Sequence, residues 1–380
     1  MTDRKAVKVV PVEANKVGRG KSGKRPGARS LLRLLPLEPF AAFSRQQLRS
    51  PGTIVLAAAC LSFLLLWAAL SLSTARPALV IGAKASAFLA IILLSLNFIL
   101  ATRSRALEGA FGGLDRMYKV HKMVGKLALL FAILHPLLLV ASRAGDLQAI
   151  GSLLVPGLNA PYTLGLLSTV AMLVLVAITV RSPLPYRIWR LTHRLLVLPL
   201  MLAMVHALLS GSDVNRYPIL AYLVVGVSLL GMLSYLYVLL LYRRLGPRAS
   251  GTVLTVRRLG SITELTIAPE TPLNFHPGQF IFIRFLRFSD VKESFPFSIS
   301  SDALDGVVRI SVKAAGDFTS GALTTSQPGD KVEMMGPYGK FGERYLAHRR
   351  DMVWIAGGIG ITPFLSMAKH ECRQPAGRRV

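Results

Sequence analysis

The sequence predicts a multi-domain membrane protein, in which a bundle of six transmembrane helices precedes an antiparallel β-barrel and the beginning of an α/β unit. Three observations support this fold class. Hydrophobic residues make up 52% of the chain and charged residues only 17%, which is typical of membrane spans. Apolar runs of about 20 residues follow one another with only short hydrophilic turns between them. After the last run, the pattern changes to period-two alternation with β-branched residues, which is typical of strands.

The membrane spans are predicted from the apolar runs, each long enough to cross a bilayer. Lys122 and Lys126 fall near the start of the third run, where their long side chains can reach the membrane interface. The six predicted spans cover residues 53–72, 85–102, 120–142, 162–180, 191–209 and 217–242.

The distribution of basic residues predicts the orientation of these spans, because cytoplasmic flanks carry an excess of Lys and Arg. With a cytoplasmic N-terminus, thirteen basic residues fall on the inner flanks and four on the outer flanks. We therefore expect a multi-pass protein of a bacterial-type plasma (inner) membrane, with everything after Tyr242 in the cytoplasm. The inner set is Arg103, Arg105, Arg116, Lys119, Lys122, Lys126, Arg181, Arg187, Arg190, Arg194, Arg243, Arg244 and Arg248, and the outer set is Arg76, Lys84, Arg143 and Arg216.

The first 50 residues form a basic tail with 12 Lys or Arg against 3 acidic residues, within a net charge of +26. Nucleic-acid binding through this tail is the alternative; a solvated or lipid-facing tail fits the flank pattern better, and we expect no nucleic-acid partner. Residues 30–49 mix Leu, Phe and Arg and are expected along the membrane surface, with Pro36 and Pro39 interrupting a single helix. No cleavable signal is expected before the first span.

Cysteine chemistry is not expected to carry the function. The chain has two cysteines, Cys60 and Cys372, and neither belongs to a CxxC motif for metal binding or redox exchange.

Histidines inside the predicted spans are the strongest functional signal. Four of the seven histidines lie there: His121 and His135 in the third span, His193 and His206 in the fifth. The 14-residue and 13-residue steps both correspond to about 20 Å along a helix, so the histidines pair at two depths. Two neutral imidazoles can ligate one haem iron from opposite faces.

Two other interpretations of these histidines stay open. One is a histidine that only forms hydrogen bonds between helices, and the other is zinc, which no Cys or carboxylate supports. In a straight helix, the side chains of His193 and His206 would point in directions about 140° apart around the helix axis. Pro199 lies between them and is expected to kink or unwind that helix so that both turn inward.

The run LDRMYKVHKMVGKLALLFAILH resembles the third helix of the NADPH oxidase and ferric reductase superfamily. The resemblance implies two b haems, the inner on His121 and His193 and the outer on His135 and His206. It suggests Arg116, Arg190 and Arg194 as partners of haem propionates.

Oxidase members often carry an Arg in the second helix and a further His after the outer ligand, and the aligned positions here are the apolar Ala90 and Leu139. Oxygen reduction to superoxide and reduction of ferric iron or its chelates are therefore both expected acceptor reactions.

Three ordered motifs predict a flavin domain of the ferredoxin-reductase type: HPGQF at 276–280, FPFSISS at 295–301 and GDFTSGAL at 316–323. By resemblance, Pro296, Phe297 and Ser298 face the flavin ring and Lys313, Gly316 and Thr319 serve the phosphates. The family usually has Arg or His where this chain has Phe295, which puts the choice of flavin in question; FAD is preferred to FMN. The expected strands are TVLTVRRL, SITELTIAP, QFIFIRF, GVVRISVK and DKVEMM.

A nucleotide-binding unit is predicted to begin near the end of the chain. MVWIA at 352–356 is expected as a strand and GGIGITPF at 357–364 as the loop that opens a helix. By resemblance, Gly357, Gly358, Gly360, Thr362 and Pro363 would bind NADPH or NADH. The few remaining residues are short of a complete domain, so the chain is expected to be truncated.

The predicted organisation is a basic cytoplasmic tail (1–50), a ferric reductase-like haem domain (51–243), an FAD-binding β-barrel (249–347) and the beginning of an NAD(P)-binding domain (351–380). The expected function is a transmembrane flavohaem oxidoreductase that passes electrons from cytosolic NAD(P)H through FAD and two b haems to an acceptor outside, ferric iron or dioxygen. Two rivals are a quinone-coupled haem subunit that serves a periplasmic partner, and a proton-coupled transporter with membrane histidines.

Overall fold

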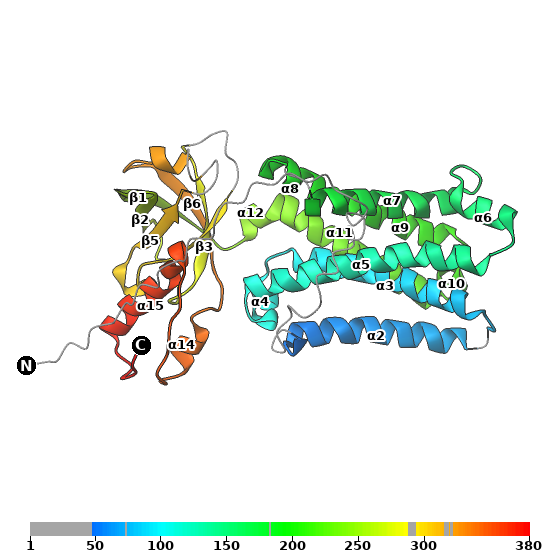
Figure 1. Ribbon diagram of the computed structural model, residues 1–380, viewed down its shortest axis with the longest axis horizontal. Coiled ribbons are helices and arrows are strands. Elements are labelled where there is room, and N and C mark those ends of the chain that lie inside the picture. The colour runs from blue at the N-terminus through cyan, green and yellow to red at the C-terminus, as the bar shows by residue number, and fades with distance from the viewer. Residues whose placement is uncertain (1–47, 73, 182–183, 288–293, 315–318, 320–321) are drawn as a thin grey trace, which may run out of the picture. The chain divides into compact units, whose positions relative to one another are not determined.

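A computed structural model of the chain describes residues 48–72, 74–181, 184–287, 294–314, 319 and 322–380. The chain forms two compact units, and the boundary between the helical unit and the sheet unit lies between Gly246 and Pro247 (Figure 1). Most of the predicted basic tail and of the predicted surface segment 30–49 lies outside the described residues.

Six helices in the described part of the chain are long and apolar enough to cross a membrane, which confirms the six predicted spans. Their axes run side by side (Figure 1). The third helix begins at Leu114, six residues before the predicted span at 120–142. These first residues are helical but too polar to have been included in the span. In chain order they are α2 (Pro51–Ser71), α3 (Ala78–Leu100), α5 (Leu114–Ser142), α7 (Ala160–Arg181), α8 (Tyr186–Arg194) with α9 (Val197–Leu209), and α11 (Pro218–Leu236), which continues through the π-helical η3 (Tyr237–Leu241) into α12 (Tyr242–Leu245).

Local sequence explains where these helices begin. Ser50 caps α2 by accepting the backbone N–H of Thr53 at 3.3 Å, and Pro51 follows in the first turn, where its missing N–H has no cost. Gly112 ends the short helix α4 (Arg105–Phe111) with φ +73°, a left-handed conformation that suits glycine. Two further short helices, α6 (Leu147–Leu154) and α10 (Asp213–Arg216), lie at the opposite end of the bundle from α4 (Figure 1).

Close packing at the centre of the bundle depends on small residues. A Cβ atom at Gly231 on α11 would lie 3.0 Å from the backbone oxygen of Ser95, so α3 and α11 can approach closely only because that position is glycine. Leu200 on α9 and Val224 on α11 are fully buried nearby in the same unit. The outward faces expose leucine and valine instead, as expected for lipid contact; examples are Leu61, Leu65, Val170, Leu173, Leu229 and Leu233.

The second unit is built on a six-stranded antiparallel sheet with the order β4-β3-β6-β1-β2-β5. The edge strands approach each other at a single bridge between Ile299 and Ile310, so the sheet is curled. Five of the strands confirm the predicted runs, while the short β4 within the FPFSISS motif was not predicted as a strand. The strands are β1 (Arg248–Leu259), β2 (Ile262–Pro269), β3 (Phe280–Phe285), β4 (Phe295–Ser298), β5 (Val308–Lys313) and β6 (Lys331–Tyr338).

The inner face of the sheet forms one hydrophobic core, which follows from the alternation of buried and partly buried residues along β2 and β5. Burial of these side chains is the main contribution to the stability of the unit. The most deeply buried members are Leu265, Ile267, Ile281, Ile283, Ile299, Val308, Ile310, Leu323 and Val332.

The strand predicted at 352–356 is wrong. These residues form no strand, and Val353 and Ile355 are 87% and 86% exposed. A β-branched run becomes a strand only when a neighbour pairs with its backbone, and the described strands all pair elsewhere. The helix predicted after the glycine loop is confirmed as α15 (Thr362–Arg373), preceded by the 3-10 turn η6 (Gly358–Ile361).

Candidate functional site

His121 on α5 and His193 on α8 face each other across the bundle; we call them the inner pair, after the predicted orientation. Their ring centroids are 6.2 Å apart and the ring planes differ by 65°. Nδ1 of His121 lies 3.1 Å from the backbone oxygen of Asn97, and Nδ1 of His193 lies 3.4 Å from the hydroxyl of Thr179. The indole of Trp189 stacks on His193 with centroids 5.3 Å apart and planes within 4°. Both imidazoles are therefore held by neighbouring groups.

His135 on α5 and His206 on α9 form the outer pair, with ring centroids 6.3 Å apart and planes differing by 60°. Nδ1 of His135 lies 2.9 Å from the backbone oxygen of Ala83, and Nδ1 of His206 lies 2.7 Å from that of Pro161. A Cβ atom at Gly165 would lie 2.9 Å from the His206 ring, so the glycine provides the space that this ring occupies.

The unbroken helix α5 carries one histidine of each pair. The 14 residues from His121 to His135 return to nearly the same direction, since a helix turns by about 100° per residue. Both histidines therefore face the same neighbours on one helix, which continues past Pro136.

The helix that carries the other two histidines, His193 and His206, is broken between them, as expected from Pro199. Helix α8 ends at Arg194 and α9 begins at Val197. Pro199 has no N–H for the carbonyl of Leu195, and its ring would clash with that carbonyl in a continuous helix. The backbone N–H of Leu198 bonds instead to the Leu195 oxygen at 2.9 Å, a tighter turn that changes the facing of α9 relative to α8.

The two pairs have the donor chemistry and spacing that an iron porphyrin needs. An imidazole that donates Nδ1–H to an oxygen keeps the lone pair of Nε2 for a metal. Iron–nitrogen bonds of about 2 Å on both faces would separate the ring centroids by about 6.3 Å, and the observed separations are 6.2 Å and 6.3 Å. In the described residues no group of three or more His, Cys, Asp or Glu could hold a metal ion, so zinc on protein ligands alone is not supported.

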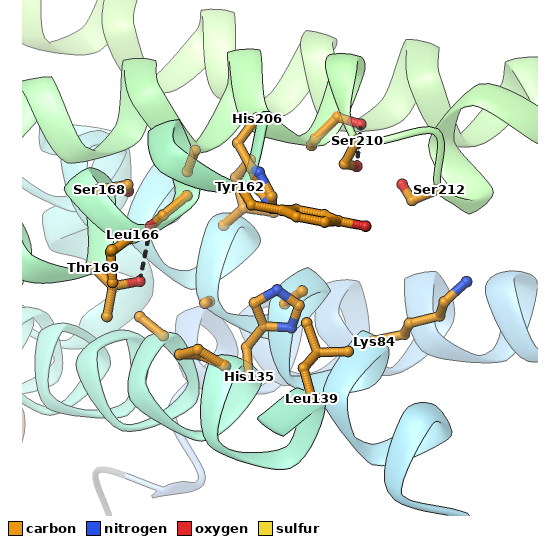
Figure 2. Close-up of a pocket in the computed structure, with 18 of the residues that line it drawn as sticks. Lys84, His135, Leu139, Tyr162, Leu166, Ser168, Thr169, His206, Ser210 and Ser212 are labelled. Atoms are coloured by element: carbon orange, nitrogen blue, oxygen red, sulfur yellow. Dashed lines mark hydrogen bonds between the residues drawn. The ribbon is translucent and has the colours of Figure 1, made fainter. Parts of the chain in front are cut away.

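A cavity of about 340 Å³ opens between the rings of the outer pair, within the size range of cofactor sites. Figure 2 shows His135 and His206 on opposite walls, with the Tyr162 hydroxyl, the Lys84 ammonium and Ser212 toward one end. Ser168 and Thr169 lie toward the other end (Figure 2). The remaining lining is mostly apolar and comes mainly from α3, α5, α7 and α9, with further residues from α6, α10 and α11. It includes Phe88, Ile91, Leu94, Leu139, Leu166 and Met172.

A buried ion cluster lies at the polar end of this cavity. Asp213, 3% exposed, accepts hydrogen bonds from Trp67 Nε1 at 2.8 Å, from both terminal nitrogens of Arg76 at 2.6 and 2.7 Å, and from Lys84 Nζ at 2.8 Å. Burial opposes ionisation of the carboxyl, but the hydrogen bonds from Arg76, Lys84 and Trp67 outweigh it and lower its pKa to about 2. The cluster joins α2, α3 and α10.

The predicted flavin-facing residues lie on β4 but do not share one face of it. Pairing with β3 sets Ser298 opposite Phe280 and Pro296 opposite Phe282, whereas Phe297 is opposite Ile281 of the core. Phe297 packs against the hydrophobic core, and Pro296 is exposed. The contact of Phe297 with a flavin ring stays a prediction.

The predicted phosphate-binding residues are only partly described. Lys313 is exposed at the end of β5, where it pairs with Ile262 of β2. Thr319 is described between two segments that are not, and Gly316 lies outside the described residues.

The predicted nucleotide loop is an exposed turn at the start of α15. Cβ atoms at Gly357, Gly358 and Gly360 would meet nothing within 4 Å, so a ligand could approach the backbone closely there. Gly358 also has φ +53°, which side chains rarely adopt. Thr362 is buried and donates its hydroxyl to the Ile359 oxygen at 3.1 Å, while Pro363 occupies the first turn of the helix. The exposed backbone N–H groups of a helix start suit an anion.

Comparison with known proteins places both units in one family. The family model for the ferric reductase like transmembrane component matches residues 86–204, and that for an FAD-binding domain matches residues 253–341. Ferric reduction oxidase 8 of Arabidopsis thaliana is 33% identical over 28% of this chain and 16% of its own length. NADPH oxidase 1 of Rattus norvegicus is 32% identical over 24% of this chain and 17% of its own. The chain belongs to the NADPH oxidase and ferric reductase superfamily.

A flavohemoprotein of Bacillus subtilis is a further relative, 33% identical over 33% of this chain and 32% of its own length. The chain thus matches about a third or less of the length of these three relatives.

Within this superfamily, the outer cavity of the present chain has an apolar wall where oxidase members often carry basic side chains. Ala90 and Leu139, the two positions singled out from the sequence, both line the cavity beside His135. The cations of the cavity come from other positions, namely Lys84 and Arg143.

At the inner end, two of the three arginines suggested for haem propionates, Arg190 and Arg194, have protein partners. Arg190 lies over the ring of Tyr186 with its guanidinium carbon 5.7 Å from the centroid. The Arg116 side chain lies against Gly112, where a Cβ atom would be 3.0 Å from it. The role of Arg116, Arg190 and Arg194 toward a porphyrin of this superfamily stays a prediction.

Sequence reasoning missed the groups that orient the histidines and the ion cluster at the cavity. Three of the four Nδ1 partners are backbone oxygens, which leave no trace in residue identity. The cluster left a usable signal: Asp213, Arg76 and Lys84 are charged residues at the outer ends of apolar runs, where isolated charges are costly.

Proposed function

We propose that this protein is a transmembrane oxidoreductase that carries electrons from NAD(P)H through FAD and two bis-histidine b haems to an acceptor on the outer face of a bacterial-type plasma membrane. The FAD-binding family match supports the flavin, and the superfamily supports NAD(P)H as the donor. The thirteen-to-four distribution of basic residues supports a cytoplasmic flavin unit.

The observation that carries the proposal is the repeated geometry of the two histidine pairs. The pairs share α5, with the second histidine on α8 in one pair and on α9 in the other. They have centroid separations of 6.2 Å and 6.3 Å and direct Nδ1 at an oxygen. A histidine that serves only to join helices needs no opposite imidazole at this distance. Two such pairs in a membrane bundle support two axially ligated porphyrins.

The residues of the chain have distinct tasks in this proposal. His121, His135, His193 and His206 would hold the two porphyrin irons through Nε2, and the oxygens that accept their Nδ1 hydrogens would fix the tautomer and raise the basicity of the imidazoles. When bound, the porphyrin irons supply one-electron redox chemistry inside a layer that otherwise insulates. The apolar helix faces around each pair exclude water. Pro296, Phe297 and Ser298 would line the flavin ring. Lys313, Gly316 and Thr319 would bind its phosphates, and Gly357, Gly358, Gly360, Thr362 and Pro363 would bind the pyridine nucleotide.

The acceptor is proposed to be ferric iron in a chelate or dioxygen. The apolar Ala90 and Leu139 in the cavity wall leave the outer cavity without the Arg and His that oxidase members often carry. This composition supports ferric reduction at least as well as superoxide formation.

Purified full-length protein tests the proposal in two steps. A visible spectrum should show a Soret band and, on reduction, the sharp bands of six-coordinate b haem at two haems per chain; a colourless preparation would contradict the haem proposal and favour the transporter. Flavin analysis comes next: a haem protein without FAD would favour the quinone-coupled subunit. Superoxide formation in air, compared with Fe(III)-chelate reduction under anaerobic conditions, then identifies the acceptor.

A further inference from the structure

Helix α15 presents one polar face to the segment 300–305, which follows β4 in the sheet unit. The side chains of this face occur at positions i, i+3, i+4 and i+7 of the helix, so they lie on the same side of it. Each of them contacts the segment. They are Ser366, Lys369, His370 and Arg373.

Two of these contacts are hydrogen bonds to backbone oxygens of the segment. Ser366 Oγ donates to the Ser301 oxygen at 2.6 Å, and Lys369 Nζ donates to the Ser300 oxygen at 2.8 Å. Ser366 and Ser301 are fully buried, and a buried carbonyl that loses its donor is costly. The helix is therefore bonded to the backbone of the segment itself.

The carboxylate of Asp302, which is fully buried, receives the other two side chains. Nδ1 of His370 lies 3.2 Å from one of its oxygens, and Nη1 of Arg373 lies 3.4 Å from the other. Arg373 also pairs with Asp305, with 2.6 Å between Nη2 and Oδ1. Hydrogen bonds and ion pairs are directional, so this interface fixes the position of α15 along the segment, whereas a purely apolar interface would allow it to slide.

Both parts of this interface lead directly to residues of the proposed cofactor sites. Residues 300–302 continue β4, whose Ser298 is proposed to face the flavin ring, and the Ser300 N–H bonds to the backbone of β5 at 2.8 Å. Helix α15 continues the proposed nucleotide loop 357–361, and the Thr362 hydroxyl bonds back to that loop at 3.1 Å. A shift of α15 would therefore carry the loop with it.

We infer that the polar face of α15 is a clamp that sets the placement of the nucleotide loop relative to the flavin strand, with Asp302 and Lys369 as positioning residues for hydride transfer. This inference rests on the proposed function and deepens it. The step transfers a hydride, which is two electrons with one proton, from NAD(P)H to the flavin, so the nucleotide is oxidised and the flavin is reduced. A misplacement of about 1 Å can slow such a step about 100-fold.

Stopped-flow reduction of the flavin by NADPH or NADH tests the clamp, with the full chain in lipid nanodiscs and without oxygen. At saturating nucleotide, Lys369→Met should slow flavin reduction about 5-fold and Asp302→Asn about 20-fold. The nucleotide concentration that gives half of the maximal rate should change less than about 2-fold, because the loop that binds the nucleotide is intact. Lys369→Arg keeps a donor for the Ser300 oxygen and should restore the rate.

Hydrogen exchange provides a readout that needs no nucleotide and no turnover. Backbone amides of 357–366 should exchange about 10-fold faster in Asp302→Asn than in the unchanged protein, while those of β2 stay the same. Lys331→Met is the matched control for Lys369→Met, because Lys331 is a lysine of the same unit whose hydrogen bonds go to Thr252 and Glu270. It should change neither the exchange nor the rate of flavin reduction.

The outcomes separate this inference from the proposed function. A flavin that stays oxidised with NAD(P)H in the unchanged protein would contradict the proposed donor, and the clamp would lose its role with it. If the unchanged protein is reduced and Asp302→Asn is reduced equally fast despite faster exchange, the contacts only stabilise the fold and the inference is overturned. Loss of FAD from Lys369→Met, or a rate that Lys369→Arg does not restore, would overturn it as well. The two Lys369 variants decide the question if Asp302→Asn does not fold.

Discussion

The inner and the outer histidine pair share their spacing but differ in their surroundings. At the inner pair, Trp189 stacks on His193, a contact that the outer pair lacks among the described residues; each pair also has one tyrosine ring at 6.4 Å, Tyr118 from His121 and Tyr162 from His206. The outer pair borders an open cavity with a cationic end. The partners of Nδ1 also differ, since His193 has a side-chain hydroxyl at 3.4 Å whereas His135 and His206 have backbone oxygens at 2.9 and 2.7 Å.

This difference indicates that the residues proposed to hold a metal and the residues that form a cavity beside it are separate features of the fold. The proposed ligation of a metal uses the same arrangement at both depths, namely opposed imidazoles. A cavity lies beside the outer pair, where small residues such as Gly165 and Ala90 contribute to its wall. Variants that affect one pair and spare the other therefore test the comparison directly.

Replacement of a histidine should have the largest effect. His121→Ala or His193→Ala should remove the inner haem, and His135→Ala or His206→Ala the outer one, because one imidazole cannot hold a six-coordinate iron. Each variant should keep about half of the haem measured by pyridine haemochrome. His348→Ala, an exposed histidine of the sheet unit, is the control and should keep all of it. Loss of both haems from every variant would show that the pairs are not independent.

The next largest effect is expected at the outer ion cluster. Asp213→Asn would leave Arg76 and Lys84 buried without a counter-charge, at a cost of about 3–5 kcal/mol. The melting temperature of the helical unit should fall by roughly 10 °C in detergent. Asp146→Asn is the matched control, because Asp146 caps α6 at the same end and asparagine caps equally well. An equal loss in both variants would contradict the special role of Asp213.

The same carboxylate predicts a dependence of stability on pH. Its pKa is lowered to about 2 in the folded protein, so its contribution is present above about pH 4 and is lost as the pH falls toward about 2. The shift corresponds to on the order of 2 kcal/mol. Melting temperatures measured between about pH 5 and about pH 2 should fall more steeply for the unchanged protein than for Asp213→Asn. Parallel dependences of melting temperature on pH in the two proteins would contradict this prediction.

A smaller effect, confined to the outer pair, is expected from Gly165→Ala. The new methyl group would lie 2.9 Å from the His206 ring and displace it from its partner oxygen. Affinity for the outer haem should fall about 10-fold, measured by titrating haem into apoprotein. Gly226→Ala on α11 is the control, since a Cβ atom there meets nothing within 4 Å. An equal change at the inner haem would argue against separate sites.

The smallest effect is expected at the inner pair from Thr179→Val, which removes the hydroxyl next to His193. Because the contact is long, at 3.4 Å, the affinity for the inner haem should fall about 10-fold or less. Its midpoint potential, measured by spectroscopic titration, should shift while that of the outer haem stays constant. Thr179→Ser keeps the hydroxyl and should restore both values.

The sequence predicted the parts of the fold that depend on repeated patterns. Apolar length gave the six spans, and alternation gave five of the six strands. It failed where structure depends on a distant partner: 352–356 is β-branched and apolar, yet no strand pairs with it. The break at Leu195 followed from Pro199, because the cost of a proline inside a helix is local.

Some residues of the candidate site could likewise be predicted from the sequence, and others could not. The histidines could be found, since an imidazole inside an apolar run stands out. Their backbone partners, such as the oxygens of Ala83 and Pro161, could not, because every residue has a carbonyl. The convergence of Asp213, Arg76 and Trp67 depends on how α10 folds back on α2, which no local pattern encodes.

A final consequence follows from α5, the continuous helix that bears a histidine of each pair. Hydrogen-bonded backbone, and not side-chain packing, sets how far apart the two metal positions can be along the membrane normal. Thinner or thicker bilayers, and mutations that loosen neighbouring helices, should then change the occupancy of a site more than the distance between the two sites. Under the proposed function, the tunnelling distance would be set by the rise of one helix.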